Sequence, residues 1–273
     1  MRLGAWTQRR CRGPGTPGRR KKLNREDAIA AWAVLGNKVV ALSKRVVLDA
    51  EFGDQSSKEF SVQLAAILLL SRTLQHFAAV RLLLENKFVV EARTIARCCY
   101  ENLFWIGGLI TKGHGFMEQV GGDYDYRTRT LMNDLAAHNL PSDPDLEPKF
   151  ATFMSEINAR PKGKAINHQA EAVGADLRDG YTYYRLLSGD AAHPSARSIS
   201  RHLDSTQEAL TITEQPLAIG DDEDLETFDL ACGALLSVCS GADTLVGGKH
   251  ADALNTVAKE FKALSAASLH IKK

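Results

Sequence analysis

The sequence predicts an all-α protein, an antiparallel helical bundle with at most one short, isolated β segment. Apolar residues recur at helical spacing through most of the chain, and short stretches rich in Gly, Pro and Asn separate them. Only residues 209–215 alternate in the manner of a strand. With 273 residues, of which 44% are hydrophobic and 25% charged, the chain has the composition of a globular protein with a substantial core.

The N-terminal segment differs from the rest in charge. Residues 1–25 hold nine Arg or Lys and no acid, which leaves about −8 for the remainder. The segment 1–23 is interpreted as a disordered basic tail or an over-extended start of the reading frame; an organellar transit segment and a nucleic-acid-binding arm are the alternatives. Residues 24–273 are expected to form a single helical domain, and their acidic balance disfavours binding to duplex nucleic acid.

The first three helices are expected over residues 24–51, 60–85 and 88–110. Asn24 is placed to cap the first, with Asp27 at its third position. Ser56 or Ser57 is expected to cap the second, which is apolar around its whole circumference and should therefore be the central helix; its Arg72 and His76 share a face. The short join of residues 86–87 predicts that the second and third helices pack antiparallel.

The second half of the chain is expected to continue in the same way. After a break at Gly113 and Gly115, helices are expected up to about residue 138 and over residues 148–158, 177–192, 225–246 and 252–270, with a further short helix capped by Ser195. The acidic run 221–224 could suggest a metal site, but acids at a helix start more simply complement its positive end.

Several functional classes lack their signatures. The chain has no phosphate-binding loop, dinucleotide fingerprint, nucleophile elbow or zinc-type Cys/His cluster, so neither a cofactor nor a metal is expected. Its five cysteines form no C-x-x-C pair, and Cys232 and Cys239 are too far apart on one helix to bridge. The longest apolar run, residues 64–70, is too short for a membrane span. A cytoplasmic location is therefore expected.

One charged stripe on the third helix is the first candidate site. Arg93, Arg97 and Glu101 recur at i, i+4 and i+8, with Tyr100 beside them. The stripe is either a solvated face or the lining of a pocket. Cys98, Phe104 and Trp105, interleaved with the charges, favour a second covered face, and the planar fork of arginine suits a carboxylate or phosphate.

The second candidate lies near the end of the helix over residues 177–192. Tyr184 and Ser188 share a helical face, and His193, followed by Pro194, ends the helix. His193 either caps the final carbonyls or serves the site as an acid, a base or a hydrogen-bond donor.

These two segments together resemble a bacterial family known only as domain of unknown function 5677. The resemblance is carried by Glu91-Ala-Arg93-Thr-Ile-Ala-Arg97-Cys-Cys-Tyr100-Glu101 and by Tyr184-Arg-Leu-Leu-Ser188 with His193-Pro194-Ser195, and it covers roughly residues 30–250. The family has no established activity. The resemblance implies that both motifs belong to one helical domain and meet in space.

A third pattern, Arg197-x4-His202, is similar to the signature of HEPN-type helical ribonucleases. In those enzymes the arginine and the histidine cleave RNA without a metal. One or two such spacings arise by chance in a chain of this composition, so the signal is weak.

Three hypotheses follow from the sequence. The leading one is a pocket for an anionic ligand or substrate, in which Arg93, Arg97, Glu101, Tyr184 and Ser188 bind and His193 exchanges a proton. The second is a metal-independent HEPN-like ribonuclease of a defence or toxin system. The third is a helical interaction protein without a site, dimeric through its first helices.

Overall fold

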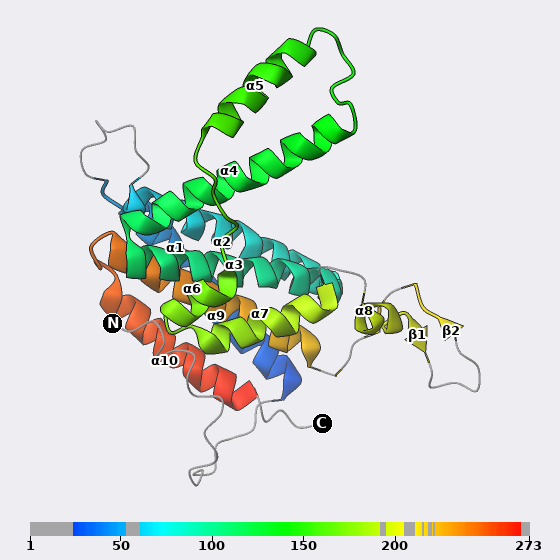
Figure 1. Ribbon diagram of the computed structural model, residues 1–273. Helices are drawn as coiled ribbons and strands as arrows, with labels where there is room; N and C mark the ends of the chain where they lie inside the picture. Colours follow the sequence, from blue (N-terminus) through cyan, green and yellow to red (C-terminus); the bar gives the residue numbers. More distant parts are fainter. Residues whose placement is uncertain are drawn as a thin grey trace.

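A computed structural model describes residues 24–52, 61–191, 195–204, 211–214, 216–217, 220 and 222–268. Within these ranges the chain forms ten helices and a two-stranded antiparallel sheet (Figure 1). The predicted all-α class is therefore confirmed. Apolar side chains from α1, α2, α3 and α9 make up most of the core, and α6, α7 and α10 pack against these helices.

The first two helices begin at side-chain caps. Helix α1 spans Arg25–Leu48, and the Asn24 side chain accepts a hydrogen bond from the Asp27 amide, as predicted. Helix α2 spans Val62–Glu85, and its cap is Ser61, whose hydroxyl accepts from the Leu64 amide. The predicted caps Ser56 and Ser57 lie outside the described residues.

The prediction that the second helix is central is wrong. Helix α3 (Val89–Lys112) occupies the centre and contacts α2, α4, α6, α7 and α9, whereas α2 keeps Leu68 and Leu82 at 48% and 61% exposure. Small residues allow the close packing of α3 on α9: a Cβ on Gly241 of α9 would overlap the side chain of Ile106 of α3. The apolar content of a helix does not reveal such packing, because it ignores side-chain size.

Helices α4 (His114–Ala137) and α5 (Glu147–Ala159) form a hairpin that projects from the bundle (Figure 1). The chain then returns to α3 through α6 (His168–Gly174), a short helix that the sequence pattern did not predict. Two polar contacts fix the segment that leads back to α3. The buried Asp123 carboxylate accepts from the Ile166 amide, and Lys112 pairs with Glu171 at 2.6 Å. The return places His168 against α3.

The next segment forms α7 (Arg178–Ala191) and α8 (Ala196–Ser200). Ser195 caps α8 through a complete capping box with Ser198, as its position predicted. Strand β1 (Leu203–Asp204) pairs with β2 (Thr211–Ile212), so the predicted β segment exists but has a partner.

Helices α9 (Glu223–Leu245) and α10 (Ala251–Ser268) end the described chain. By length and composition alone, α2 and α9 could each cross a membrane; 72% of the apolar window of α9 is buried in the fold, against 28% for α2. Core helices of water-soluble proteins satisfy the same criterion, and α9 is a core helix here. The four described cysteines are free thiols.

Candidate functional site

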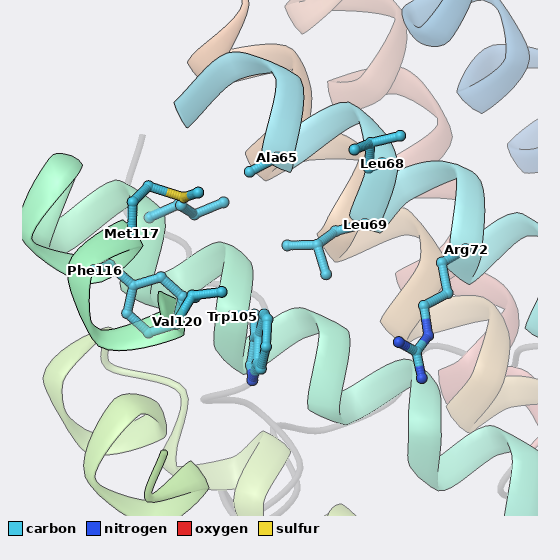
Figure 2. A pocket seen from close by; sticks show the side chains of 9 residues that line it. Ala65, Leu68, Leu69, Arg72, Trp105, Phe116, Met117 and Val120 are labelled. Atoms are coloured by element: carbon cyan, nitrogen blue, oxygen red, sulfur yellow. The ribbon is translucent and has the colours of Figure 1, made fainter. Parts of the chain in front are cut away.

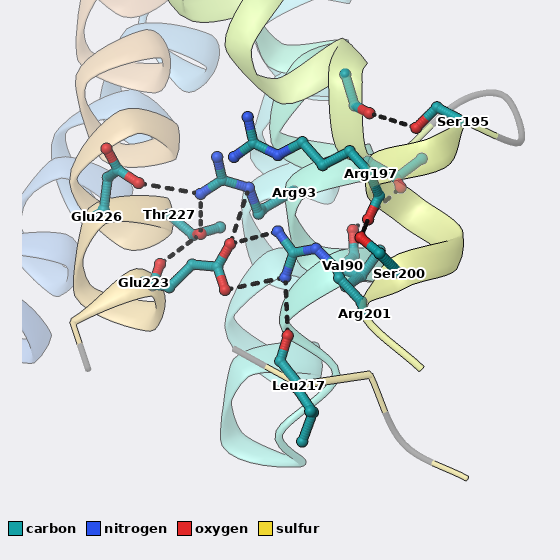
Figure 3. Close-up of polar contacts among 12 residues, drawn as sticks. Val90, Arg93, Ser195, Arg197, Ser200, Arg201, Leu217, Glu223, Glu226 and Thr227 are labelled. Atoms are coloured by element: carbon teal, nitrogen blue, oxygen red, sulfur yellow. Dashed lines mark hydrogen bonds and ion pairs between the residues drawn. The ribbon is translucent and has the colours of Figure 1, made fainter. Parts of the chain in front are cut away.

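Arg93 and Arg97 share a helical stripe, but their side chains contact different neighbours. The Arg93 side chain is 1% exposed and lies against the first turn of α9. Its Nη1 donates to Oε2 of Glu226 at 3.1 Å and to the Thr227 hydroxyl at 3.4 Å, and its Nε lies 3.6 Å from Oε1 of Glu223 (Figure 3). Arg93 is thus engaged in a buried ion network, away from the proposed pocket.

Glu223 is the centre of this network. Arg201, which follows α8, donates to both of its carboxylate oxygens, with Nη2 to Oε1 at 2.6 Å and Nη1 to Oε2 at 3.0 Å. The side chains of Arg201 and Glu223 are 2% and 6% exposed. The network therefore ties α3, α8 and α9 together, since a buried carboxylate between two guanidinium groups is strongly held. In the described part of the chain no group of three or more His, Cys, Asp or Glu is arranged to hold a metal.

Arg97 lies in a second cluster, between α3 and α7. Its Nε and Nη2 both donate to Oε1 of Glu101, at 3.1 Å and 2.6 Å, and its guanidinium carbon lies 5.4 Å from the centre of the Tyr184 ring. Among the described residues, Nη1 of Arg97 and Oε2 of Glu101 have no protein partner. Both side chains are partly open, at 22% and 23% exposure. The guanidinium is thus oriented by the protein but still has donors to offer.

His168 forms one wall of this cluster. Its ring packs edge-on to Tyr184, with centroids 5.9 Å apart, and lies 6.1 Å from the ring of Phe104. Burial lowers the pKa of His168, and the positive charges of Arg127 and Arg97 add to that effect, while Glu101 opposes it. A neutral imidazole beside a guanidinium is therefore expected at neutral pH.

Helix α2 brings two further residues, Arg72 and His76, close to Glu101 and Cys98. The Asn102 side chain donates to the Thr73 hydroxyl at 2.9 Å, and because α2 and α3 run antiparallel, this contact places Glu101 between the levels of Arg72 and His76. Burial and the charge of Arg72 lower the pKa of His76, against the opposing charge of Glu101. The buried Nδ1 of His76 has no hydrogen-bond partner within the described residues, an uncommon condition for a buried polar nitrogen.

Arg97 itself is strongly cationic. Burial would lower its pKa, but the hydrogen bond and the charge of Glu101 raise it above the ordinary value. The neighbouring Cys98 thiol is half-buried, and burial raises its pKa, assisted by Glu101. Cys98 is thus protonated and is not a nucleophile at neutral pH.

We call Arg72, His76, Arg97, Glu101, His168 and Tyr184 the arginine cluster. It contains three residues of the sequence-based site, namely Arg97, Glu101 and Tyr184. Ser188 lies one turn further along α7, where its hydroxyl donates to the Tyr184 carbonyl at 2.7 Å. His193 lies outside the described residues.

Three members of the arginine cluster were not predicted as site residues. Arg72 and His76 were expected to share a face of the second helix, but not to lie near Arg97. The short join predicted that the second and third helices pack antiparallel, and this packing was the available signal that Arg72 and His76 lie near Arg97. For His168 the available signal was Asn167, whose side chain caps α6 by accepting from the Gln169 and Ala170 amides, but α6 itself was not predicted.

The residues of the ribonuclease-like pattern lie beside the buried network. Arg197 on α8 and His202 in the following turn are both exposed. The ring Nδ1 of His202 lies 3.1 Å from the Thr213 carbonyl oxygen. Because that oxygen only accepts, Nδ1 must carry the proton, and Nε2 of a neutral His202 is left as an acceptor.

Comparison with known proteins gives one match. The model of a family described as "Family of unknown function (DUF5677)" matches residues 63–210, more than half of the chain. No curated protein and no solved structure matches. The matched segment runs from the start of α2 to the residues after β1, so it includes every residue of the arginine cluster. The resemblance expected from the two motifs is confirmed, and the chain belongs to this family of unknown function, DUF5677.

Proposed function

We propose that this protein binds a small organic anion at the arginine cluster. The observation that carries the proposal is the state of Arg97, whose guanidinium is held on one edge by Glu101 and beneath by the Tyr184 ring while Nη1 stays free for a ligand. A planar donor group fixed in advance loses little conformational freedom on binding, which favours recognition of a carboxylate or a phosphate.

The charge balance of the cluster favours a monoanion. Arg72 and Arg97 contribute two positive charges and Glu101 one negative charge, while the lowered pKa values of His76 and His168 keep both rings neutral near pH 7. A carboxylate neutralises the remaining charge, whereas a phosphate dianion exceeds it. The orphan Nδ1 of His76 offers a further polar contact to the ligand.

The remaining residues of the sequence-based site have different roles in this proposal. Arg93 is engaged by α9 and supports the fold. The Ser188 hydroxyl, which donates to the Tyr184 carbonyl, keeps its lone pairs as acceptors. His193 follows α7 in the chain and stays a candidate proton donor, which His193→Ala tests directly by the same binding measurement. We place the protein in the cytosol, where its thiols stay reduced.

Calorimetric titration tests the proposal with hexanoate as the probe and 1-hexanol as its uncharged counterpart. Arg97→Gln is expected to weaken hexanoate binding about tenfold to a hundredfold, the usual worth of hydrogen bonds to a charged group. Arg185→Gln is the matched control, since Arg185 is exposed on α7. Equal affinity of Arg97→Gln and the unaltered protein for hexanoate would contradict the proposal.

A second candidate activity, metal-independent cleavage of RNA, is supported by His202. Its bond to the Thr213 carbonyl leaves Nε2 free to accept a proton from a 2′-hydroxyl, and exposed Arg197 lies on the preceding helix. Incubation with single-stranded RNA in the presence of a chelator tests this. Cleavage lost in His202→Ala and kept in His114→Ala supports the activity; cleavage unchanged in His202→Ala contradicts it.

A third candidate is an interaction role without a site, with two copies joined through α1 and α2. The exposed Leu68 and Leu82 of α2 are the observation in its favour. Sedimentation velocity separates it from the others: a dimer lost in Leu82→Glu supports it, and a monomer at all concentrations contradicts it.

A further inference from the structure

A cavity of about 220 Å³ lies between α2, α3 and α4, beside the arginine cluster (Figure 2). Its lining is almost entirely apolar and includes Leu69, Trp105, Phe116 and Val120. Of the described residues that line it, Arg72 alone is charged. Leu68, which lines the cavity, is 48% exposed, so the cavity opens to the surface.

Arg72 belongs to both the cavity and the arginine cluster. Figure 2 shows its side chain extending from α2 toward α3, with Leu69 and Trp105 on the cavity side. Its charge also reaches His76 and Cys98 on the cluster side. On α3, Trp105 follows Glu101 by one turn on the same face. The cavity and the cluster therefore share Arg72 and lie next to each other along α2 and α3.

Arg72 forms no ion pair within the described part of the chain. Three other arginines of this region are paired, namely Arg97 with Glu101, Arg93 with Glu223 and Arg127 with Asp123. The Arg72 guanidinium is exposed at the mouth of the apolar cavity, where it can pair with the anionic head of a ligand whose hydrocarbon body enters the cavity.

We infer that the ligand is a hydrophobic monocarboxylate, whose carboxylate lies at Arg72 and whose hydrocarbon body fills the cavity. This inference rests on the proposed function and specifies its ligand class. The size agrees: an apolar cavity of about 150 Å³ holds benzene, and drug-sized ligands need at least about 300 Å³. A volume of about 220 Å³ suits one aromatic ring with a short chain, or an alkyl chain of medium length.

A chain-length series tests the inference by calorimetry. The probes are butanoate, hexanoate and octanoate, 4-phenylbutanoate as the aromatic form, and 1-octanol as the uncharged form. Affinity is expected to rise about threefold to fourfold for each added methylene, the usual gain for burying that group, until the cavity is full. Comparison of octanoate with 4-phenylbutanoate then shows whether an alkyl or an aryl body fits the cavity better.

Two substitutions on the same helix provide the structural control. Ala65→Phe places a ring into the cavity, and Ala78→Phe adds the same ring on the exposed face of α2. Ala65→Phe is expected to abolish the chain-length dependence, and Ala78→Phe to keep it. Circular dichroism at the binding temperature confirms that each variant is folded. A third variant, Arg72→Gln, is expected to remove the preference for octanoate over 1-octanol.

The outcomes separate the two proposals. Carboxylates that bind with the same affinity at every chain length, in the unaltered protein and in Ala65→Phe alike, overturn the hydrophobic ligand class and leave the anion site standing. Carboxylates that fail to bind at any chain length overturn both. An octanoate preference that persists in Arg72→Gln overturns the placement of the carboxylate.

Discussion

The guanidinium carbon of Arg97 lies 5.4 Å from the ring centre of Tyr184, so α3 and α7 meet at a cation–aromatic contact between residues far apart in the chain. Such a contact contributes about 0.5–1 kcal/mol at an exposed site and more where water is excluded. Its larger effect here is orientation, because Tyr184 and Glu101 together leave one edge of the guanidinium for a ligand.

Loss of Arg201 is expected to destabilise the fold. Arg201→Ala removes the guanidinium that pairs with the Glu223 carboxylate, which is 6% exposed. Removal of one partner from a buried ion pair lowers the free energy of unfolding by about 3 kcal/mol or more. Urea denaturation of this variant and of Arg185→Ala measures the difference. Arg185 is exposed, so its substitution should change the free energy of unfolding by less than about 0.5 kcal/mol. Equal effects of the two would show that the network does not hold α8 to α9.

Close packing of α3 on α9 predicts a contrast between two glycines. A Cβ on Gly241 would overlap Ile106, so Gly241→Ala is expected to destabilise the protein by about 1–3 kcal/mol. A Cβ on Gly121 of α4 meets nothing within 4 Å, so Gly121→Ala is expected to raise stability by up to about 1 kcal/mol through helix propensity. Thermal unfolding compares them, and a stabilising Gly241→Ala would refute the packing.

Stability is expected to fall as the pH drops below 6.5, the ordinary histidine value. The pKa values of His168 and His76 are lowered in the folded protein, chiefly by burial, so the unfolded chain takes up protons in this window that the folded chain does not. Above the window both states hold neutral rings and the contribution is constant.

Denaturation between neutral and mildly acidic pH measures this slope. His168→Gln and His76→Gln should each flatten it, because each removes a ring whose pKa is lowered in the folded protein. A slope unchanged in both cluster variants would mean that neither ring is kept neutral by the fold.

Local signals predicted most of the helices. Each of these signals lies within a few residues of the helix end or helix face that it sets, so a single sequence is enough to find it. They are the caps Asn24 and Ser195, the break at Gly113 and the apolar periodicity. Helix α6 was missed because it is short and is stabilised by tertiary contacts, such as the Lys112–Glu171 pair and the fully buried Ala172.

The site was only partly predictable. Helical spacing placed Arg93 and Arg97 on one stripe, but it could not show that the carboxylates of α9 lie beside the first while Glu101 and Tyr184 hold the second. Partners that are distant in sequence depend on how helices pack, and the error over the central helix shows that apolar content does not determine that packing.

The most direct test of the anion site is a nitrogen–proton NMR spectrum of the arginine side chains, recorded while octanoate is added. Anion binding at the arginine cluster predicts that the Nε–H signals of Arg72 and Arg97 shift with saturation, while those of buried Arg93 and Arg201 stay in place. Signals of Arg72 and Arg97 that remain unmoved, or that shift together with those of Arg93 and Arg201, would contradict it.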